Sequence, residues 1–264
     1  MFKEYFGLQK SIFQKDILPN DLFPNEHLSE FKARLDYMLK ARGIILLTGD
    51  PGTGKTTAVR SFINGLNPEH FMTCYSPLAT VSIGDFYKQL NDKLNGENVS
   101  SKVKLFKSIQ ERILHYSVNM NKIPVIVIDE AHLLKNDNFF ELQIICNFQM
   151  DSLDPAIIIL IAQPHLLDRL NRSYLESFSQ RINLKYHFSH FSPKQTSDYV
   201  KHQLKSAKAD NSIFNDNALK TIHTLTDGVL RKINHLCLKS LSLAVTIKKQ
   251  KITEEEVIAA SKEI

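Results

Sequence analysis

One run of eight residues has the types and spacing that bind phosphate groups: Gly49-Asp50-Pro51-Gly52-Thr53-Gly54-Lys55-Thr56. It matches the pattern G-x-x-x-x-G-K-[ST]. It also stands between an apolar run at residues 44–47 and a helical pattern from residue 57, the strand–loop–helix context that the pattern requires. Glycines permit backbone angles that other residues avoid, so successive N–H groups can surround an anion at a helix N-terminus. The alternative is a glycine turn that arose by chance.

The loop predicts a bound nucleotide with Mg²⁺. We expect residues Gly49 to Thr57 to hold the phosphates, with Lys55 reaching the β- and γ-phosphates and the Thr56 hydroxyl ligating the metal. A loop of this kind indicates nucleotide binding but does not establish hydrolysis.

An acidic pair further along the chain supplies the hydrolytic chemistry. Asp129 and Glu130 follow the β-branched run at residues 125–128, which is typical of a strand buried on both faces of a parallel sheet. Open α/β sheets bind ligands at the carboxyl ends of their strands. We therefore predict that Asp129 holds Mg²⁺ through a water and that Glu130 polarises the water attacking the γ-phosphate. The alternative is an acidic N-cap for a following helix. Together with the loop, the pair predicts an NTP hydrolase.

Composition restricts the class of protein. The 264 residues are 43% hydrophobic and 23% charged, as in soluble globular proteins, and the longest apolar run, residues 156–162, is shorter than the about 20 residues that span a bilayer. Three scattered cysteines and the lack of a signal peptide predict a cytoplasmic protein without a membrane partner. The formal charge of +5 is compatible with a polyanionic partner but does not require one.

Strands and helices alternate up to about residue 190, which predicts a parallel sheet covered on both faces. Beyond Ser192-Pro193 the pattern is helical only, with a break at Asp227-Gly228 and a capping box at residues 253–256. The sequence thus predicts an α/β fold in three parts. Residues 1–25 form a leader wrapping onto the core, 26–190 a P-loop domain with a helix at about 138–151, and 191–264 a small helical lid domain.

This organisation, with the two motifs, resembles the AAA+ ATPases over nearly the whole chain. More narrowly it resembles the ExeA-type branch, which is related to transposon-encoded ATPases of the TniB and TnsC type. The resemblance implies ATP as the nucleotide. The stretches that carry it are Tyr5-Phe6-Gly7-Leu8 through Phe13, Leu22-Phe23, His27-Leu28, residues 161–166 and Asp227-Gly228-Val229-Leu230-Arg231-Lys232-Ile233-Asn234.

The resemblance implies roles for two more residues. Gln163 ends the strand beside the acidic pair and matches sensor 1, whose amide could reach the γ-phosphate or the attacking water; the alternative is a turn with Pro164. Arg231 matches sensor 2, an arginine that can contact the phosphates across the cleft between the two domains. Its alternative is an exposed helix arginine.

An arginine before a strand in this region is usually the finger that such ATPases insert into a neighbouring subunit's site. Arg181 matches it best and Arg172 is the second choice; a salt-bridged surface arginine is the alternative for each. A finger supplied in trans can raise the rate by about 10³–10⁵, so hydrolysis would depend on assembly into a homo-oligomer, a ring or a filament. The resemblance also implicates residues around Ile17 and Leu22-Phe23 in an adenine pocket, although these could be plain core.

Three functions remain open. The first is a DNA-associated assembly ATPase with double-stranded DNA and a transposase as partners, touching DNA through residues 76–82 and Lys88, which could equally be an ordinary connection. The second is a secretion-associated ATPase of the ExeA kind. Such proteins usually continue into a membrane span and a cell-wall-binding part, which we do not find in this sequence. The third, a small-molecule kinase, is disfavoured by the acidic pair, by Arg231 and by the helical end.

Overall fold

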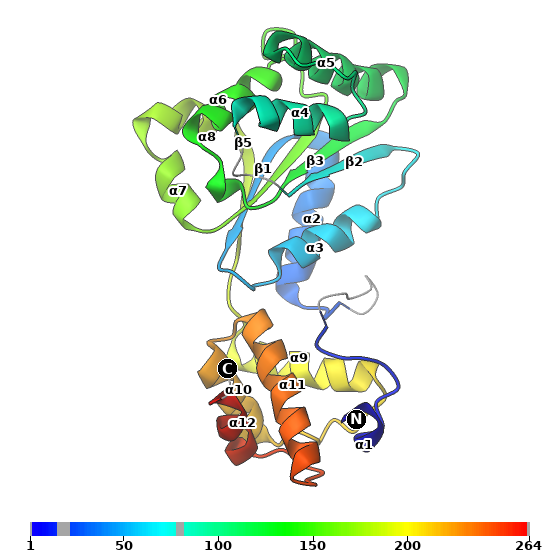
Figure 1. Ribbon diagram of the computed structural model, residues 1–264, viewed down its shortest axis with the longest axis vertical. Coiled ribbons are helices and arrows are strands. Elements are labelled where there is room, and N and C mark those ends of the chain that lie inside the picture. The colour runs from blue at the N-terminus through cyan, green and yellow to red at the C-terminus, as the bar shows by residue number, and fades with distance from the viewer. Residues whose placement is uncertain (1, 15–21, 78–81, 263–264) are drawn as a thin grey trace. The chain divides into compact units, whose positions relative to one another are not determined.

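The computed structural model describes residues 2–14, 22–77 and 82–262, and the chain forms two compact units (Figure 1). We call the first the α/β unit; it consists of His27–Gly49 and Ala58–Phe188. We call the second the helical unit; it consists of Met1–Glu26, Asp50–Thr57 and Ser189–Ile264. The phosphate loop is therefore grouped with the helical unit, although it continues directly from the first strand of the other.

The α/β unit is built on a five-stranded parallel sheet with the order β2-β3-β4-β1-β5. Its strands are β1 (Gly43–Gly49), β2 (Phe71–Ser76), β3 (Ile123–Ile128), β4 (Ile157–Ala162) and β5 (Ile182–Phe188). Its helices are α2 (Glu26–Ala41), α3 (Lys55–Asn64), α4 (Ile83–Lys93), α5 (Lys102–Leu114), α6 (Asn136–Ile145), α7 (His165–Leu170) and α8 (Glu176–Gln180).

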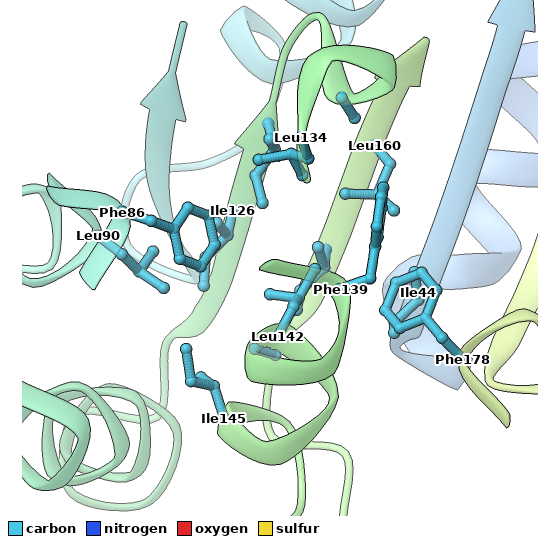
Figure 2. Close-up of a cluster of buried hydrophobic side chains, with 14 of the residues drawn as sticks. Ile44, Phe86, Leu90, Ile126, Leu134, Phe139, Leu142, Ile145, Leu160 and Phe178 are labelled. Atoms are coloured by element: carbon cyan, nitrogen blue, oxygen red, sulfur yellow. The ribbon is translucent and has the colours of Figure 1, made fainter. Parts of the chain in front are cut away.

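Apolar side chains cover both faces of the sheet. On one face, residues of β3 and β4 pack with α4 and α6; Figure 2 shows Ile126 and Leu160 among Phe86, Phe139 and Leu142. The other face is covered by side chains of α2 and α3. Each fully buried Leu, Ile or Phe contributes about 1.5–3 kcal/mol to stability. The three central strands, β1, β3 and β4, are accordingly apolar runs with almost no exposed surface, and the predicted parallel α/β architecture is confirmed.

The helical unit contains α1 (Phe2–Tyr5), α9 (Pro193–Ser206), α10 (Asp216–Thr226), α11 (Leu230–Thr246) and α12 (Glu254–Ser261). The Ser192 side chain caps α9 by accepting from Gln195 N–H, and Pro193 occupies the first turn, where no N–H is needed. Thr253 and Glu256 form the capping box predicted for α12.

The described leader residues belong to the helical unit. The apolar leader residues Phe6, Leu8, Ile12 and Phe13 are buried in the core of the helical unit, where the Phe13 ring meets that of Tyr199 with centroids 6.2 Å apart. The sequence reveals that these residues are apolar but not which core receives them. The predicted adenine-pocket residue Ile17 and the predicted contact residues 78–81 lie outside the described part of the chain.

The segment before β4 also differs from the prediction. Helix α6 ends at Ile145 rather than near residue 151, because Phe148 pairs with Leu153 in an isolated antiparallel bridge. Between them, Gln149, Met150 and Asp151 all have positive φ, of 48°, 56° and 67°. Three such residues in succession cannot continue a right-handed helix.

Candidate functional site

The phosphate loop has the geometry that its glycines permit. Gly52 and Gly54 have φ of 88° and 94°, in the region that L side chains rarely adopt. The carbonyl oxygen of Asp50 accepts from the Thr53 hydroxyl at 2.8 Å and from Lys55 Nζ at 2.9 Å, which closes the loop at the start of α3. Lys55 is 9% exposed, so its ammonium is held within the loop that the sequence assigns to phosphates.

The start of α11 packs directly against this loop inside the helical unit. Arg231 N–H donates to the Gly52 carbonyl at 3.0 Å. A Cβ at Gly52 would lie 2.8 Å from Arg231 Cβ, and one at Gly54 would lie 3.2 Å from Leu230 Cδ2. The two glycines therefore serve a close approach as well as a turn. Arg231 therefore lies beside the phosphate loop, and its role as sensor 2 stays a prediction.

His190 contacts both the phosphate loop and the residue that follows α10. His190 Nε2 lies 2.8 Å from Asp50 Oδ2 of the phosphate loop, and His190 Nδ1 lies 3.1 Å from Asp227 Oδ2 at the end of α10. Asp227 stands in the left-handed conformation that stops α10 just before Gly228 and Arg231. The sequence does not predict this link, because no local pattern relates positions 50, 190 and 227.

Gly228 gives a test of this joint. Its φ is +69°, and a Cβ there would lie 2.0 Å from the Phe191 carbonyl oxygen and 2.9 Å from the Phe191 nitrogen. We expect Gly228→Ala to lower the free energy of unfolding by more than about 2 kcal/mol, because it combines a strained φ with a backbone clash. Urea denaturation measures this. Gly84→Ala is the control. Gly84 has an ordinary φ within α4, and the nearest atom to a Cβ built there is Ser82 Oγ, at 3.9 Å. The free energy of unfolding of this variant should therefore be unchanged or higher. Equal stability of Gly228→Ala and the wild type would contradict the described joint.

The acidic pair lies at the carboxyl edge of the sheet in the α/β unit. Asp129 follows β3 directly and is 6% exposed. Its Oδ1 accepts from Glu130 N–H at 2.8 Å and its Oδ2 accepts from the Tyr75 hydroxyl at 3.0 Å. Burial, followed by the neighbouring Asp129 carboxylate, raises the pKa of Tyr75 to about 12, so the phenol keeps its proton and acts as the donor. Carboxylate oxygen is the ligand type that Mg²⁺ prefers, and Asp129 fits a magnesium site in this respect.

Glu130 has the exposure that a group activating water needs. Its side chain is 55% exposed and its Oε2 lies 3.4 Å from His132 Nδ1. Its backbone is left-handed at φ 53° and ψ 35°, and it makes no side-chain cap bond to the short turn at Ala131–Leu133. The helix-cap alternative for Glu130 is therefore not realised. Strained backbone of this kind concentrates at functional sites.

Gln163 follows β4 at the same edge of the sheet. Its side chain is half-buried, its N–H donates to His132 Nδ1 at 3.4 Å, and its carbonyl accepts from Leu166 N–H at 3.1 Å. The alternative of a turn with Pro164 is thus realised by the backbone, which leaves the sensor 1 prediction untested. Arg169 holds the loop after β3 by donating to the His132 carbonyl at 3.0 Å and the Leu134 carbonyl at 2.7 Å.

Arg181 lies at the amino-terminal end of the parallel strands, opposite to the carboxyl end at which Asp129 and Gln163 lie. It immediately precedes β5, whose Ile182 pairs with Ile44 near the beginning of β1, whereas Asp129 and Gln163 follow the carboxyl ends of their strands. Arg181 Nη2 pairs with Asp151 Oδ2 at 2.7 Å, and its side chain is 22% exposed. Arg172 is exposed before the short turn at Ser173–Leu175. The α/β unit does not bring Arg181 to the edge that carries its own acidic pair.

The sheet, the phosphate loop and the acidic pair define a P-loop nucleotide-binding fold. Residues 38–170 match a family model described as AAA domain, and the chain belongs to this family. Among curated proteins it is similar to "General secretion pathway protein A" of Aeromonas hydrophila, with 30% identity over 271 aligned residues that cover 100% of this chain and 48% of the relative. The chain thus spans about half the length of the curated relative it matches.

Solved structures show the same fold at low sequence identity. Cdc6p from Pyrobaculum aerophilum has a TM-score of 0.74 with 18% identity, over 96% of this chain and 70% of that one. The ORC1 protein of Aeropyrum pernix, in complex with DNA, has a TM-score of 0.68 with 16% identity, over 95% of this chain and 68% of that one. In the described residues, every helix is too short or too polar to cross a membrane.

Proposed function

We propose that this chain is an AAA+ ATPase that binds ATP with Mg²⁺ and hydrolyses it. The observation that carries the proposal is the paired chemistry of its two parts: a phosphate loop contacted by Arg231, and a buried Asp129 beside an exposed Glu130 at a strand end. The match of residues 38–170 to the AAA domain model supports it.

Each residue has a distinct part in this proposal. The amides of residues 49–57 and the Lys55 ammonium hold the phosphates, and Arg231 adds a second positive charge beside the loop. Thr56 and Asp129 would hold Mg²⁺, which neutralises charge on the phosphate oxygens. Glu130 takes a proton from the attacking water, and Gln163 orients that water or the γ-phosphate. The helical unit acts as the lid that senses the nucleotide.

We further propose that hydrolysis requires a second copy of the chain. Arg181 stands before β5, at the other edge of the sheet from Asp129. Strands β4 and β1 lie between β3 and β5. Strand β1 runs through seven residues, so its length is about 20 Å. A finger at Arg181 is therefore suited to a neighbouring subunit's nucleotide, which makes a homo-oligomer, a ring or a filament, the active form.

For the macromolecular partner, the first candidate is double-stranded DNA in a transposition complex with a transposase. It is supported by the resemblance to transposon-encoded ATPases and is compatible with the net charge of +5. Contacts of an ATPase filament with the DNA backbone would be sequence-neutral and salt-sensitive. The second candidate is a protein partner in secretion. It is supported by the 30% identity to General secretion pathway protein A along the whole of this chain.

Sedimentation with a non-hydrolysable ATP analogue tests assembly, and filter binding with duplex DNA at low and high salt tests the first partner. We expect large species only with the analogue, and salt-sensitive DNA retention by those species. Lys55→Ala is the control and should lose nucleotide binding, assembly and DNA retention together. Assembly without DNA retention at low salt would reject the DNA candidate in favour of a protein partner. ATP turnover that is independent of chain concentration would contradict the requirement for a second copy.

A further inference from the structure

Tyr75 contacts the acidic pair although it belongs to none of the motifs that the sequence reveals. It lies near the end of β2, where the parallel register pairs it with Val127, two residues before Asp129. Its hydroxyl donates to Asp129 Oδ2 at 3.0 Å. The side chain is partly exposed, so it is not there to fill the core.

Both oxygens of the Asp129 carboxylate receive a hydrogen bond from a fixed donor. Oδ2 receives the Tyr75 hydroxyl and Oδ1 receives the Glu130 N–H. The main chain is fixed as well, because Asp129 N–H donates to the carbonyl of Ser76 at 3.0 Å. Two consecutive residues of β2 therefore hold the side chain and the backbone of Asp129, and the carboxylate has one orientation.

We propose that Tyr75 is a positioning residue for Asp129 and sets the affinity of the site for Mg²⁺. The proposal rests on the proposed function of Asp129 in holding Mg²⁺. Groups that hydrogen-bond to a metal ligand fix its direction, and their loss typically costs about 10–100-fold in metal affinity or activity. Without the Tyr75 hydroxyl, the Asp129 carboxylate loses one of the bonds that fix its direction and has more freedom to lose when Mg²⁺ binds.

The matched control comes from a second tyrosine–carboxylate pair of the same unit. The hydroxyl of Tyr87, on α4, donates to Glu141 Oε2 at 2.7 Å, and its side chain is buried. Tyr75→Phe and Tyr87→Phe each remove one hydroxyl from one carboxylate and keep the ring. A general loss of stability would affect both variants. An effect on Mg²⁺ binding should appear only in Tyr75→Phe, because only Tyr75 contacts Asp129.

The experiment measures the affinity of a fluorescent ADP as a function of Mg²⁺ concentration. We expect Tyr75→Phe to leave the affinity without Mg²⁺ unchanged and to raise the half-saturating Mg²⁺ concentration about tenfold. At saturating Mg²⁺, kcat should return close to wild type, and Tyr87→Phe should match wild type throughout.

Two results would overturn the proposal, and they are distinguishable. In the first, nucleotide binding by the wild type depends on Mg²⁺, but Tyr75→Phe has the same half-saturating Mg²⁺ concentration. This result rejects the role of Tyr75 and leaves the proposed function intact. Nucleotide binding by the wild type that does not respond to Mg²⁺ at all rejects the metal role of Asp129 itself. A shift of equal size in Tyr87→Phe would assign the effect to stability and also reject the role of Tyr75.

Discussion

A chain carrying Glu130→Gln is expected to bind ATP with wild-type affinity and to turn it over at least about 100-fold more slowly. Removal of a general base costs about 10²–10⁴ in rate, and glutamine keeps the size of the side chain while losing its capacity to accept a proton. The backbone at Glu130 is held by the bond from its N–H to Asp129 Oδ1, which the substitution does not touch. Single-turnover hydrolysis and equilibrium nucleotide binding measure the two effects separately.

The control for this prediction is Glu111→Gln on α5. Glu111 is also exposed, at 64%, and lies 3.7 Å from Lys107 in an ordinary helix pair. Such pairs contribute only about 0.3–0.5 kcal/mol, so turnover and affinity should stay at wild-type values. Full turnover by Glu130→Gln would show that another group activates the water.

Arg181→Ala is expected to lower turnover by about 1,000-fold in the assembled state, in the range measured for arginine fingers. ATP binding by the dilute chain should be unchanged, because Arg181 lies at the far edge of the sheet from Asp129. Asp151→Asn removes the carboxylate that pairs with Arg181 in the single chain and leaves the guanidinium in place. That variant should retain turnover.

Mixing two inactive variants tests whether the arginine acts in trans. Glu130→Gln chains keep Arg181, and Arg181→Ala chains keep Glu130. An oligomer that contains both should recover part of the wild-type turnover, at those contacts where a Glu130→Gln chain supplies the arginine. No recovery, with assembly intact, would contradict the role in trans. Wild-type turnover by Arg181→Ala together with loss in Arg172→Ala would transfer the assignment to Arg172.

The sequence was most informative where a function depends on consecutive residues. The apolar runs at 44–47 and 125–128 predicted β1 and β3, since a parallel strand buried on both faces must be apolar throughout. The sequence also predicts that the phosphate loop and Asp129 follow strand ends, because strand, loop and helix are consecutive along the chain.

The links between distant segments could not be predicted from the sequence. The contacts of His190 with Asp50 and Asp227, and of Tyr75 with Asp129, join residues whose local patterns carry no information about one another. The sequence does not specify which core receives Phe6 and Phe13 for a related reason: their burial is equally favourable in any apolar environment. Such contacts depend on how complete elements pack together, which one sequence read locally does not specify.

The composition of the helical unit has a consequence for the order of folding. Gln9 N–H donates to the Ala207 carbonyl at 2.9 Å, and Phe13 N–H donates to Gln203 Oε1 at 3.4 Å, across a separation of 190 residues. On a ribosome, where chains fold from the N-terminus onward, the whole α/β unit emerges before α9 does. Phe6 and Leu8 must then stay unburied until the helices of the helical unit have been made. Closing so long a loop is a slow, non-local step, so residues made before the whole α/β unit are buried only after it has been made.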